Sequence, residues 1–556
     1  MTHPLRGLLI AQFCGAFNDN AWKLMVALLA IRQLASTTAP GPEFETASQT
    51  QTTLAFVIFT FPLVVVSIVA GMLADRVSKR TVIIMMKSVE VLLMSAATLA
   101  LWLHPAGGML PLIVLAGMGV HSALFSPAKY GILAELLPHE RLAAGNGQLE
   151  MWTFFAILTG TAAPGILMSL TGNAVWVAPL LLTGLALVGF RAAWTIPAVP
   201  PARAEGGLMN TLQGAWSAIA RDRMLRLAIC GAVFFWTIAS LFAQNILVYA
   251  KAVLMVPDWQ SGLPLMMLSI GIGLGARWVG RLSKARVEYG LIPLGAAGVA
   301  VMLAVVGLVA PGLTATLALM VVLGTSSALI FVPLNALIQW RAPHDRRGSV
   351  IAFENTCVFT GILLGSLGAG ALASTGVSTT GIFTAAAVFT VAGTAWALWL
   401  LPEALLRAVL VILTNSLYRL RIVGHEHVPK AGGALLVPNH VSFIDGLLLI
   451  ASLDRHVRFV VDAQYAEQPL FKPLMKLFGV IPISSYGGLR MVLRALREAG
   501  AALDVRDLVS IFPEGQITRT GTMLPFRRGF ERIMKGRSAP IIPVHLDRVW
   551  GSVFSF

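Results

Sequence analysis

GMLADRVSKR, residues 71–80, joins two long apolar segments through a loop of a few residues with three basic side chains. Apolar segments of about 20 residues are long enough to cross a bilayer as helices. The whole chain has the matching composition, because 56% of its 556 residues are hydrophobic and only 12% are charged. Soluble domains average about 25% charged residues. The stretch therefore predicts consecutive membrane-spanning helices.

Twelve apolar segments are predicted along the first 400 residues, in two sets of six separated by a polar connection at 198–226 that contains an amphipathic piece ending at Arg226. The first set lies near 7–31, 52–74, 81–103, 109–133, 148–171 and 175–197, and the second near 227–250, 261–283, 289–309, 312–340, 349–373 and 380–401. If the helices alternate in direction, the loops rich in Arg and Lys all fall on one side. The positive-inside rule then predicts that both termini are cytoplasmic.

An internal repeat supports the division into two sets. Residues 75–79 (DRVSK) match residues 280–284 (GRLSK) at an offset of 205, and the same offset aligns Ser122-Ala-Leu with Ser327-Ala-Leu. Several matches at nearly one offset indicate duplicated halves.

Residues 71–80 resemble the loop signature of major facilitator transporters. Three further stretches resemble the bacterial lysophospholipid transporters of that superfamily: AQFCGAFNDNAWK (11–23), FSPAKYGILAEL (125–136) and FVPLNALIQ (331–339). The resemblance implies two six-helix bundles around a cavity that opens alternately to each side. Gly280 stands where the first half has Asp75, so a gating ion pair at these loops would be asymmetric.

Polar side chains within the apolar segments are the candidates for transport, because placing them in lipid costs several kcal/mol unless they are paired or face a cavity. The candidates for the transport cavity are Asp19, Asn20, Lys129, Gln244 and Asn335. The candidates for gating at the cytoplasmic loops are Asp75, Arg76, Glu150 and Glu354. For Asp75, Glu150 and Glu354 the alternative is that they only hold loops together.

The pattern changes after Pro402, since the last 156 residues hold 19 of the 41 basic and 12 of the 26 acidic residues. Residues 404–424 predict an amphipathic helix on a membrane surface. GGALLVPNH (432–440) then predicts a buried strand that ends in a turn. Asp445, three residues after Ser442, could belong to a helix capping box, which leaves Asn439 and His440 unexplained.

Four motifs of this segment resemble the glycerophospholipid acyltransferase family: Asn439-His440-x4-Asp445, GVIPI (479–483), FPEGQITRTG (512–521) and PIIPVHL (540–546). His440 can act as a general base on a glycerol hydroxyl, with Asp445 holding its tautomer. Gly515 permits close backbone approach, and backbone N–H groups with Arg519 could bind the acceptor's phosphate. The resemblance makes Glu514 an acceptor-site residue, and Asn439 is assigned to the same acceptor and phosphate site. Ser484 follows the second motif at the place where the family usually has an arginine. Arg527 or Arg528 could supply the phosphate contact of that missing arginine.

The fold class expected is a multi-span helical membrane protein of the major facilitator fold, followed by a cytoplasmic α/β acyltransferase domain. The expected domains are a transporter, 1–402, with halves 1–197 and 227–402, and an acyltransferase domain, 403–556, which could continue into an acyl-carrier-protein ligase as in some relatives.

The function expected is import of lysophospholipids across a bacterial inner membrane and their reacylation by acyl-carrier protein or acyl-CoA. One alternative is an exporter of another amphiphile fused to a lysophosphatidate acyltransferase, and another is a scaffold with an inactive enzyme. Acyl-carrier protein and membrane lipids are the expected partners, without nucleic acid, bound cofactor or metal.

Overall fold

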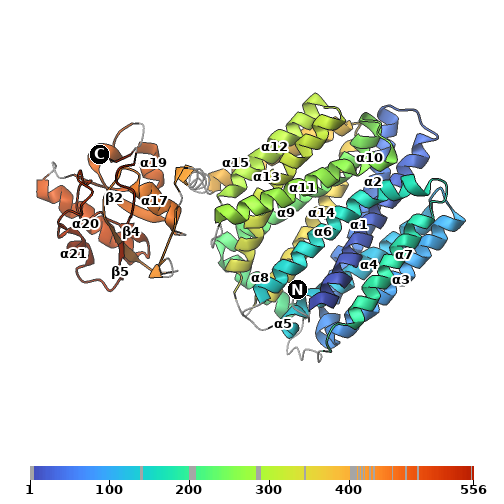
Figure 1. Cartoon of the computed structure of the whole chain (residues 1–556), viewed down its shortest axis with the longest axis horizontal. Coiled ribbons are helices and arrows are strands. Elements are labelled where there is room, and N and C mark those ends of the chain that lie inside the picture. Colours follow the sequence, from blue (N-terminus) through green and yellow to red (C-terminus); the bar gives the residue numbers. More distant parts are fainter. Residues whose placement is uncertain are drawn as a thin grey trace. The chain divides into compact units, whose positions relative to one another are not determined.

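The protein is described here from a computed structural model, drawn as a ribbon in Figure 1. The structure describes residues 5–137, 142–198, 208–283, 290–343, 346–400, 410, 413–414, 417–418, 420–424, 427–429, 432–453, 455–469, 472–484, 488–552 and 554–555. The chain forms two compact units: a helical unit, Met1–Val279 with Leu294–Ala395, and an α/β unit, Gly280–Pro293 with Trp396–Phe556. The domain boundary expected at 402 and most of the helix expected at 404–424 lie outside the described residues.

Eleven of the described helices are long and apolar enough to cross a membrane. They are α2 (Pro42–Arg76), α3 (Lys79–Leu103), α4 (Met109–Gly131), α6 (Leu142–Thr171), α7 (Val177–Trp194), α9 (Arg223–Val248), α11 (Leu263–Ser283), α12 (Leu291–Val309), α13 (Leu313–Arg341), α14 (Arg347–Ser374) and α15 (Thr379–Leu400). A further long helix, α1 (Arg6–Ala35), is more polar because Asp19, Lys23 and Arg32 lie among its apolar side chains. With α1, six long helices precede the central connection and six follow it.

The central connection contains one amphipathic helix, α8 (Leu208–Arg221). It is shorter than the sequence predicts, because Asp222 starts α9 by accepting hydrogen bonds from the backbone N–H groups of Met224 and Leu225. Arg341, at the end of α13, donates two further bonds to the same carboxylate, at 2.9 and 3.1 Å. Burial disfavours the charged form of Asp222, but these bonds outweigh burial and lower the pKa of its carboxyl group. Asp222 therefore fastens the start of α9 to α13.

The two halves of the helical unit meet where α2 packs on α14 and where α6 packs on α10 (Asp258–Ser261). Gly370 of α14 lies so close to α2 that a Cβ atom there would be 2.8 Å from Thr53 Cγ2. A Cβ atom at Gly165 of α6 would clash with the carbonyl oxygen of Asp258. Glycine thus permits close backbone approach at these two contacts.

Glu45, at the start of α2, links the halves by a side-chain cap. Its Oε2 accepts hydrogen bonds from the Thr379 backbone N–H at 3.0 Å and from Thr379 Oγ1 at 2.8 Å. Thr379 begins α15, so a carboxylate from the first half binds the N-terminus of a helix in the second half. Helix N-termini favour such anions through their free N–H groups and their dipole.

The α/β unit contains a five-stranded parallel sheet in the order β3-β2-β4-β1-β5. Its strands are β1 (Ala434–Pro438), β2 (Val457–Asp462), β3 (Ile481–Ile483), β4 (Leu508–Ser510) and β5 (Ile541–Val544). The helices between them are α17 (Asp445–Ser452), α18 (Ala463–Ala466), α19 (Lys472–Leu477), α20 (Gly488–Asp504) and α21 (Gly529–Met534). All five residues of β1 are buried, which confirms the strand predicted there.

Two hydrophobic clusters cover the two faces of this sheet. Leu435 and Val437 of β1 pack in one cluster with α20 and Ile533 of α21. Ala434 and Leu436 point the other way, into a cluster with residues of α17. Side chains alternate along a strand, so β1 contributes to both clusters and helices cover both faces of the sheet around it. The carboxyl end of β1 is left accessible. His440 follows that end, where ligands bind in open parallel sheets.

Candidate functional site

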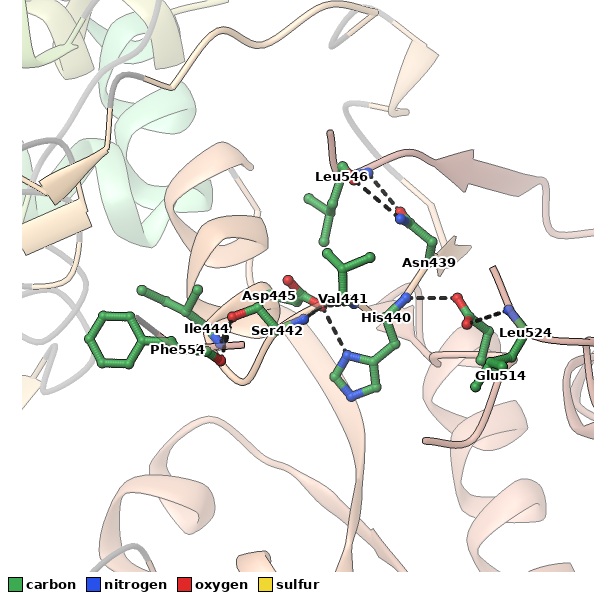
Figure 2. Close-up of polar contacts among 10 residues, drawn as sticks. All are labelled: Asn439, His440, Val441, Ser442, Ile444, Asp445, Glu514, Leu524, Leu546 and Phe554. Atoms are coloured by element: carbon green, nitrogen blue, oxygen red, sulfur yellow. Dashed lines mark hydrogen bonds and ion pairs between the residues drawn. The ribbon is translucent and has the colours of Figure 1, made fainter. Parts of the chain in front are cut away.

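The site in the α/β unit is built around His440 and Asp445. His440 Nδ1 lies 2.9 Å from Asp445 Oδ2 (Figure 2). The same oxygen accepts the backbone N–H groups of Val441 at 2.7 Å and Ser442 at 2.9 Å. Asp445 is the first residue of α17, with Ile444 as the N-cap, so it does not occupy the N3 position of a capping box. Its carboxylate instead ties the segment 441–442 to the orientation of His440. Asp445 is fully buried, and these three bonds hold its carboxylate in place.

The His440 ring is positioned by its second neighbour, Phe512. The two rings stack with centroids 4.1 Å apart. The histidine side chain keeps 20% of its surface exposed. In the described part of the chain Nδ1 is the ring nitrogen that has a protein partner, which leaves Nε2 for a bound molecule. With Asp445 accepting from Nδ1–H, the arrangement can take a proton at Nε2 and stabilise the resulting imidazolium.

Glu514 connects the histidine segment to the FPEG loop. Its Oε1 accepts the backbone N–H of His440 at 2.8 Å, and its Oε2 accepts the backbone N–H of Leu524 at 2.8 Å. Only 2% of the residue is exposed. Thr518 adds a backbone bond, donating its N–H to the His440 carbonyl oxygen at 3.0 Å. The FPEG loop is therefore fixed to the His440 segment at several points.

Asn439 fixes the fourth motif to the His440 segment in the same way. Its Oδ1 accepts the Leu546 N–H at 2.7 Å, and its Nδ2 donates to the Leu546 carbonyl at 3.2 Å. Figure 2 shows this pair of bonds beside those of Glu514. The side chains of Asn439 and Glu514 are thus engaged with the backbone in this structure. A role for either residue in contacting the acceptor stays a prediction.

The cationic candidates for the acceptor's phosphate lie around Gly515, whose φ of 71° is in the left-handed region. A Cβ atom at Gly515 would be 2.9 Å from Arg527 Nε, so the Arg527 side chain lies directly against this backbone. Arg519 is exposed on the same loop. The structure therefore places Arg527, which the sequence offered only as a substitute, next to the loop that also carries Arg519.

In the helical unit, Asp19 of α1 accepts a hydrogen bond from Ser122 of α4. Asn20 Oδ1 accepts from Lys23 Nζ at 3.3 Å. That ammonium group also lies 4.7 and 5.1 Å from the ring centroids of Phe56 and Phe59. Of the predicted cavity residues, Asp19 and Asn20 therefore belong to one polar region between α1, α2 and α4.

The other predicted transport residues are dispersed. Lys129 Nζ lies 4.8 Å from the Tyr130 ring centroid, while Gln244 Nε2 donates to the Ser366 carbonyl at 3.0 Å inside the second half. Asn335 is half-buried on α13, and Glu354 is buried on α14. The side chains of Asp75, Arg76 and Glu150 lie outside the described residues, so their predicted gating role has no geometry here.

A buried ionic cluster next to Asp19 was not predicted from the sequence. Glu90 of α3 binds Lys87 Nζ at 2.6 Å and accepts from Asn18 Nδ2 at 2.8 Å, with His121 Nε2 at 3.7 Å. All four side chains are at most 1% exposed. The signal available in the sequence was the pair of opposite charges three residues apart within an apolar helix. Asn18 also donates to the Leu182 carbonyl, so the cluster fastens α1 to α3, α4 and α7.

The helices and the sheet together define a class of protein: an integral membrane transporter fold joined to an α/β domain with a paired His and Asp. Residues 8–366 match the family model described as Major Facilitator Superfamily, and the chain belongs to that superfamily. Residues 419–547 match the family model described as Acyltransferase, so the α/β unit contains an acyltransferase domain. Both families expected from the sequence motifs are confirmed.

Curated relatives match the helical part. The lysophospholipid transporter LplT of Photorhabdus laumondii is 29% identical over 346 residues, which cover 61% of this chain and 80% of the relative. The LplT protein of Klebsiella pneumoniae is 29% identical over 359 residues, covering 63% of this chain and 83% of the relative.

Solved transporters share the fold of the helical part. A POT family transporter in complex with a thioalcohol conjugated peptide matches with a TM-score of 0.56 at 11% identity, over 72% of this chain and 96% of that one. A bacterial homologue of the human lysosomal transporter Spinster matches with a TM-score of 0.54 at 12% identity, over 71% and 96%. At these identities the likeness shows the fold alone.

Proposed function

We propose that the protein moves lysophospholipids across the bacterial inner membrane to the cytoplasmic leaflet and reacylates them there. Relatives named as lysophospholipid transporters support the transport step. The acyltransferase domain supports the second step. The observation that carries the enzymatic proposal is the His440–Asp445 pair, held at 2.9 Å at the carboxyl end of β1.

In the proposed reaction the free glycerol hydroxyl of the lysolipid attacks the carbonyl carbon of an acyl thioester. His440 Nε2 removes the hydroxyl proton as the new C–O bond forms. Asp445, bonded to Nδ1–H, stabilises the imidazolium. The C–S bond then breaks, and the imidazolium returns the proton to the leaving thiolate. The products are a diacyl phospholipid and a free thiol.

The acyl donor is acyl-carrier protein or acyl-CoA, which binds as a co-substrate, and the reaction as proposed requires no resident cofactor. Gly515 and Arg519, together with Arg527, are the proposed contacts for the acceptor's phosphate. The basic loops of the helical unit support a cytoplasmic location for both termini and for the acyltransferase domain. A hydroxyl in the inner leaflet is then on the same side of the membrane as His440.

For transport we propose that the cavity is lined by polar side chains from both halves. These are Asp19, Asn20, Lys129, Gln244 and Asn335, with gating by Asp75, Arg76, Glu150 and Glu354. The polar region around Asp19 offers both a carboxylate and, in Lys23, an ammonium group near two aromatic rings. Such a pair complements a zwitterionic lipid headgroup better than an anionic one.

The test is an acylation assay with purified protein, a panel of lysolipids and both donors. We expect diacyl product from lysophosphatidylethanolamine, and a loss of about 10²–10⁴-fold in kcat for His440→Ala, the typical contribution of a general base. Near-normal activity of His440→Ala would remove this residue from the mechanism. A preference for lysophosphatidate would instead support an exporter fused to a biosynthetic enzyme.

A further inference from the structure

The outer face of α20 carries a row of arginines. Arg490, Arg494 and Arg497 recur at the four- and three-residue spacing that places side chains on one face of a helix. All three are exposed, and within the described chain none has an ion pair or a side-chain hydrogen bond. The opposite face of α20, which includes Ala495 and Ala499, is buried against the sheet.

Helix α21 packs against α20. A Cβ atom at Gly529 would be 3.7 Å from a Leu496 methyl group, and after the helix Arg537 binds Asp504 with two bonds of 2.9 Å. Arg532 is exposed on α21 and adds a fourth cation without an ion pair in the described structure. We call Arg490, Arg494, Arg497 and Arg532 the α20–α21 arginine surface.

Most carboxylates near this surface are already engaged. Hydrogen bonds from Arg537 lower the pKa of the Asp504 carboxyl group, which keeps it ionised and paired. Glu498 lies 3.3 Å from Arg458. Glu531 is the exposed carboxylate that remains on α21. The arginine surface therefore keeps a positive excess that neighbouring side chains do not neutralise.

One end of the surface leads to the catalytic histidine. A Cβ atom at Gly529, the first residue of α21, would be 3.7 Å from Ile511 Cδ1. The next residue after Ile511 is Phe512, whose ring stacks on His440. A macromolecule bound along α20 and α21 thus lies next to the segment that positions the catalytic ring.

A lipid bilayer is a second class of anionic surface, but a different part of the domain suits it better. Phe443, Tyr465 and Phe554 are 43–52% exposed. Phe443 lies two residues before α17, which covers the opposite face of the sheet from α20 and α21. Aromatic side chains are favoured at membrane–water interfaces. On α20 the exposed large apolar side chains are Leu489 and Met491 beside Arg490, and from Arg494 to Asp504 the exposed residues include none.

We propose that the α20–α21 arginine surface is the docking site for an acidic acyl-carrier protein, which presents its thioester to His440. This inference rests on the proposed acyltransferase function and adds to it the place where the donor binds. Complementary charge speeds encounter and sets orientation. The arginines of this surface supply the positive partner for an acidic protein. The approach of Gly529 to Ile511, which directly precedes Phe512, gives the thioester a short route to the histidine.

The test compares two triple charge reversals in the full-length protein. Arg494→Glu/Arg497→Glu/Arg532→Glu alters the arginine surface, and Lys472→Glu/Lys476→Glu/Arg548→Glu makes the same change in net charge on other exposed positions. Each variant is assayed with acyl-carrier protein and with acyl-CoA, at low and at high salt. We expect the first variant to raise KM for acyl-carrier protein about tenfold or more at low salt, because attraction between exposed charges is screened by salt. Its kcat, and its KM for acyl-CoA, stay unchanged.

An equal rise in KM for both triple variants would overturn the proposal, since total charge would then account for the effect. So would an unchanged KM for acyl-carrier protein combined with weaker binding to vesicles of anionic lipid, which would assign the surface to the membrane. Wild-type protein that uses acyl-CoA but not acyl-carrier protein would refute the docking site and preserve the enzyme. Wild-type protein that uses neither donor would refute the proposed function, and the docking site with it.

Discussion

Glu514 is a buried carboxylate whose two oxygens each accept one backbone N–H group. These two bonds give the side chain a structural role, because the two amides belong to His440 and to Leu524 at the far end of the FPEG loop. The residue therefore sets the distance between His440 and the loop with the phosphate-binding candidates.

Glu514→Gln is expected to lower kcat about 100-fold while changing KM for the lysolipid little. The amide has one oxygen and one NH2 group, so one of the two backbone N–H groups would face a donor. A displacement of about 1 Å at a catalytic group costs about 10²-fold in rate. Steady-state kinetics over a range of lysolipid concentrations measures kcat and KM separately.

Glu531→Gln, an exposed carboxylate on α21, is the matched control and should leave both constants unchanged. A rise in KM for Glu514→Gln with normal kcat would show direct contact with the acceptor, as the family resemblance implies.

The pairing of His440 with Asp445 was expected from the resemblance of the four motifs to an acyltransferase family, and the structure brings the two side chains to 2.9 Å. The partners of Asn439 and Glu514 could not be predicted, since a motif gives residue types but not the backbone groups that they bind. Lys87 and Glu90 escaped prediction for a different reason. In a helix of an apolar membrane segment their charges cancel locally, and only packing shows that both are fully buried.

At the scale of helices, the contact between α2 and α15 couples the two halves. Removing a helix N-cap typically costs about 0.5–2 kcal/mol. We therefore expect Glu45→Ala to favour separation of the two halves at the end of the helical unit that carries Glu45. The equilibrium between joined and separated halves should shift about tenfold, since 1.4 kcal/mol corresponds to a factor of ten. Thr53→Cys, which replaces a side chain in contact with Gly370, would report this opening through faster labelling by a membrane-impermeant maleimide.

Glu43→Ala is the control, because Glu43 is exposed in the first turn of α2 and has no interaction with another described side chain. Equal labelling rates in the two variants would show that the Glu45 cap does not hold the halves together.

The elements themselves were predictable to different degrees. Long apolar segments identified the membrane helices within a few residues, although α2 begins at Pro42 rather than near residue 52. Its first turns are polar, so hydropathy does not reveal them. The order of strands in the sheet was beyond prediction, because β1 pairs with β4 and β5, and no local pattern encodes pairing between distant segments.

At the scale of the whole molecule, the two activities should separate by mutation. Asp19→Asn or Lys129→Ala is expected to impair lysolipid translocation in proteoliposomes while leaving acylation of lysolipid in detergent unchanged. The reason is that the catalytic geometry is built within residues 439–546 of the α/β unit. His440→Ala should show the reverse pattern.

Glu43→Gln provides a control for changing an acidic residue of the helical unit. Normal flipping by both the Asp19 and the Lys129 variants would remove these residues from the cavity. Loss of acylation in either would show that the two units depend on each other.

The bond between Asn439 and Leu546 spans 107 residues of sequence. During synthesis on the ribosome, β1 emerges before both of its neighbours in the sheet, and the loop with His440 cannot be fixed until β5 has been made. The membrane helices depend mainly on local bonds and form early. We therefore expect each newly made copy to insert its membrane helices before its acyltransferase domain is complete. A nascent chain that stops before β5 contains His440 but lacks the Asn439–Leu546 bonds.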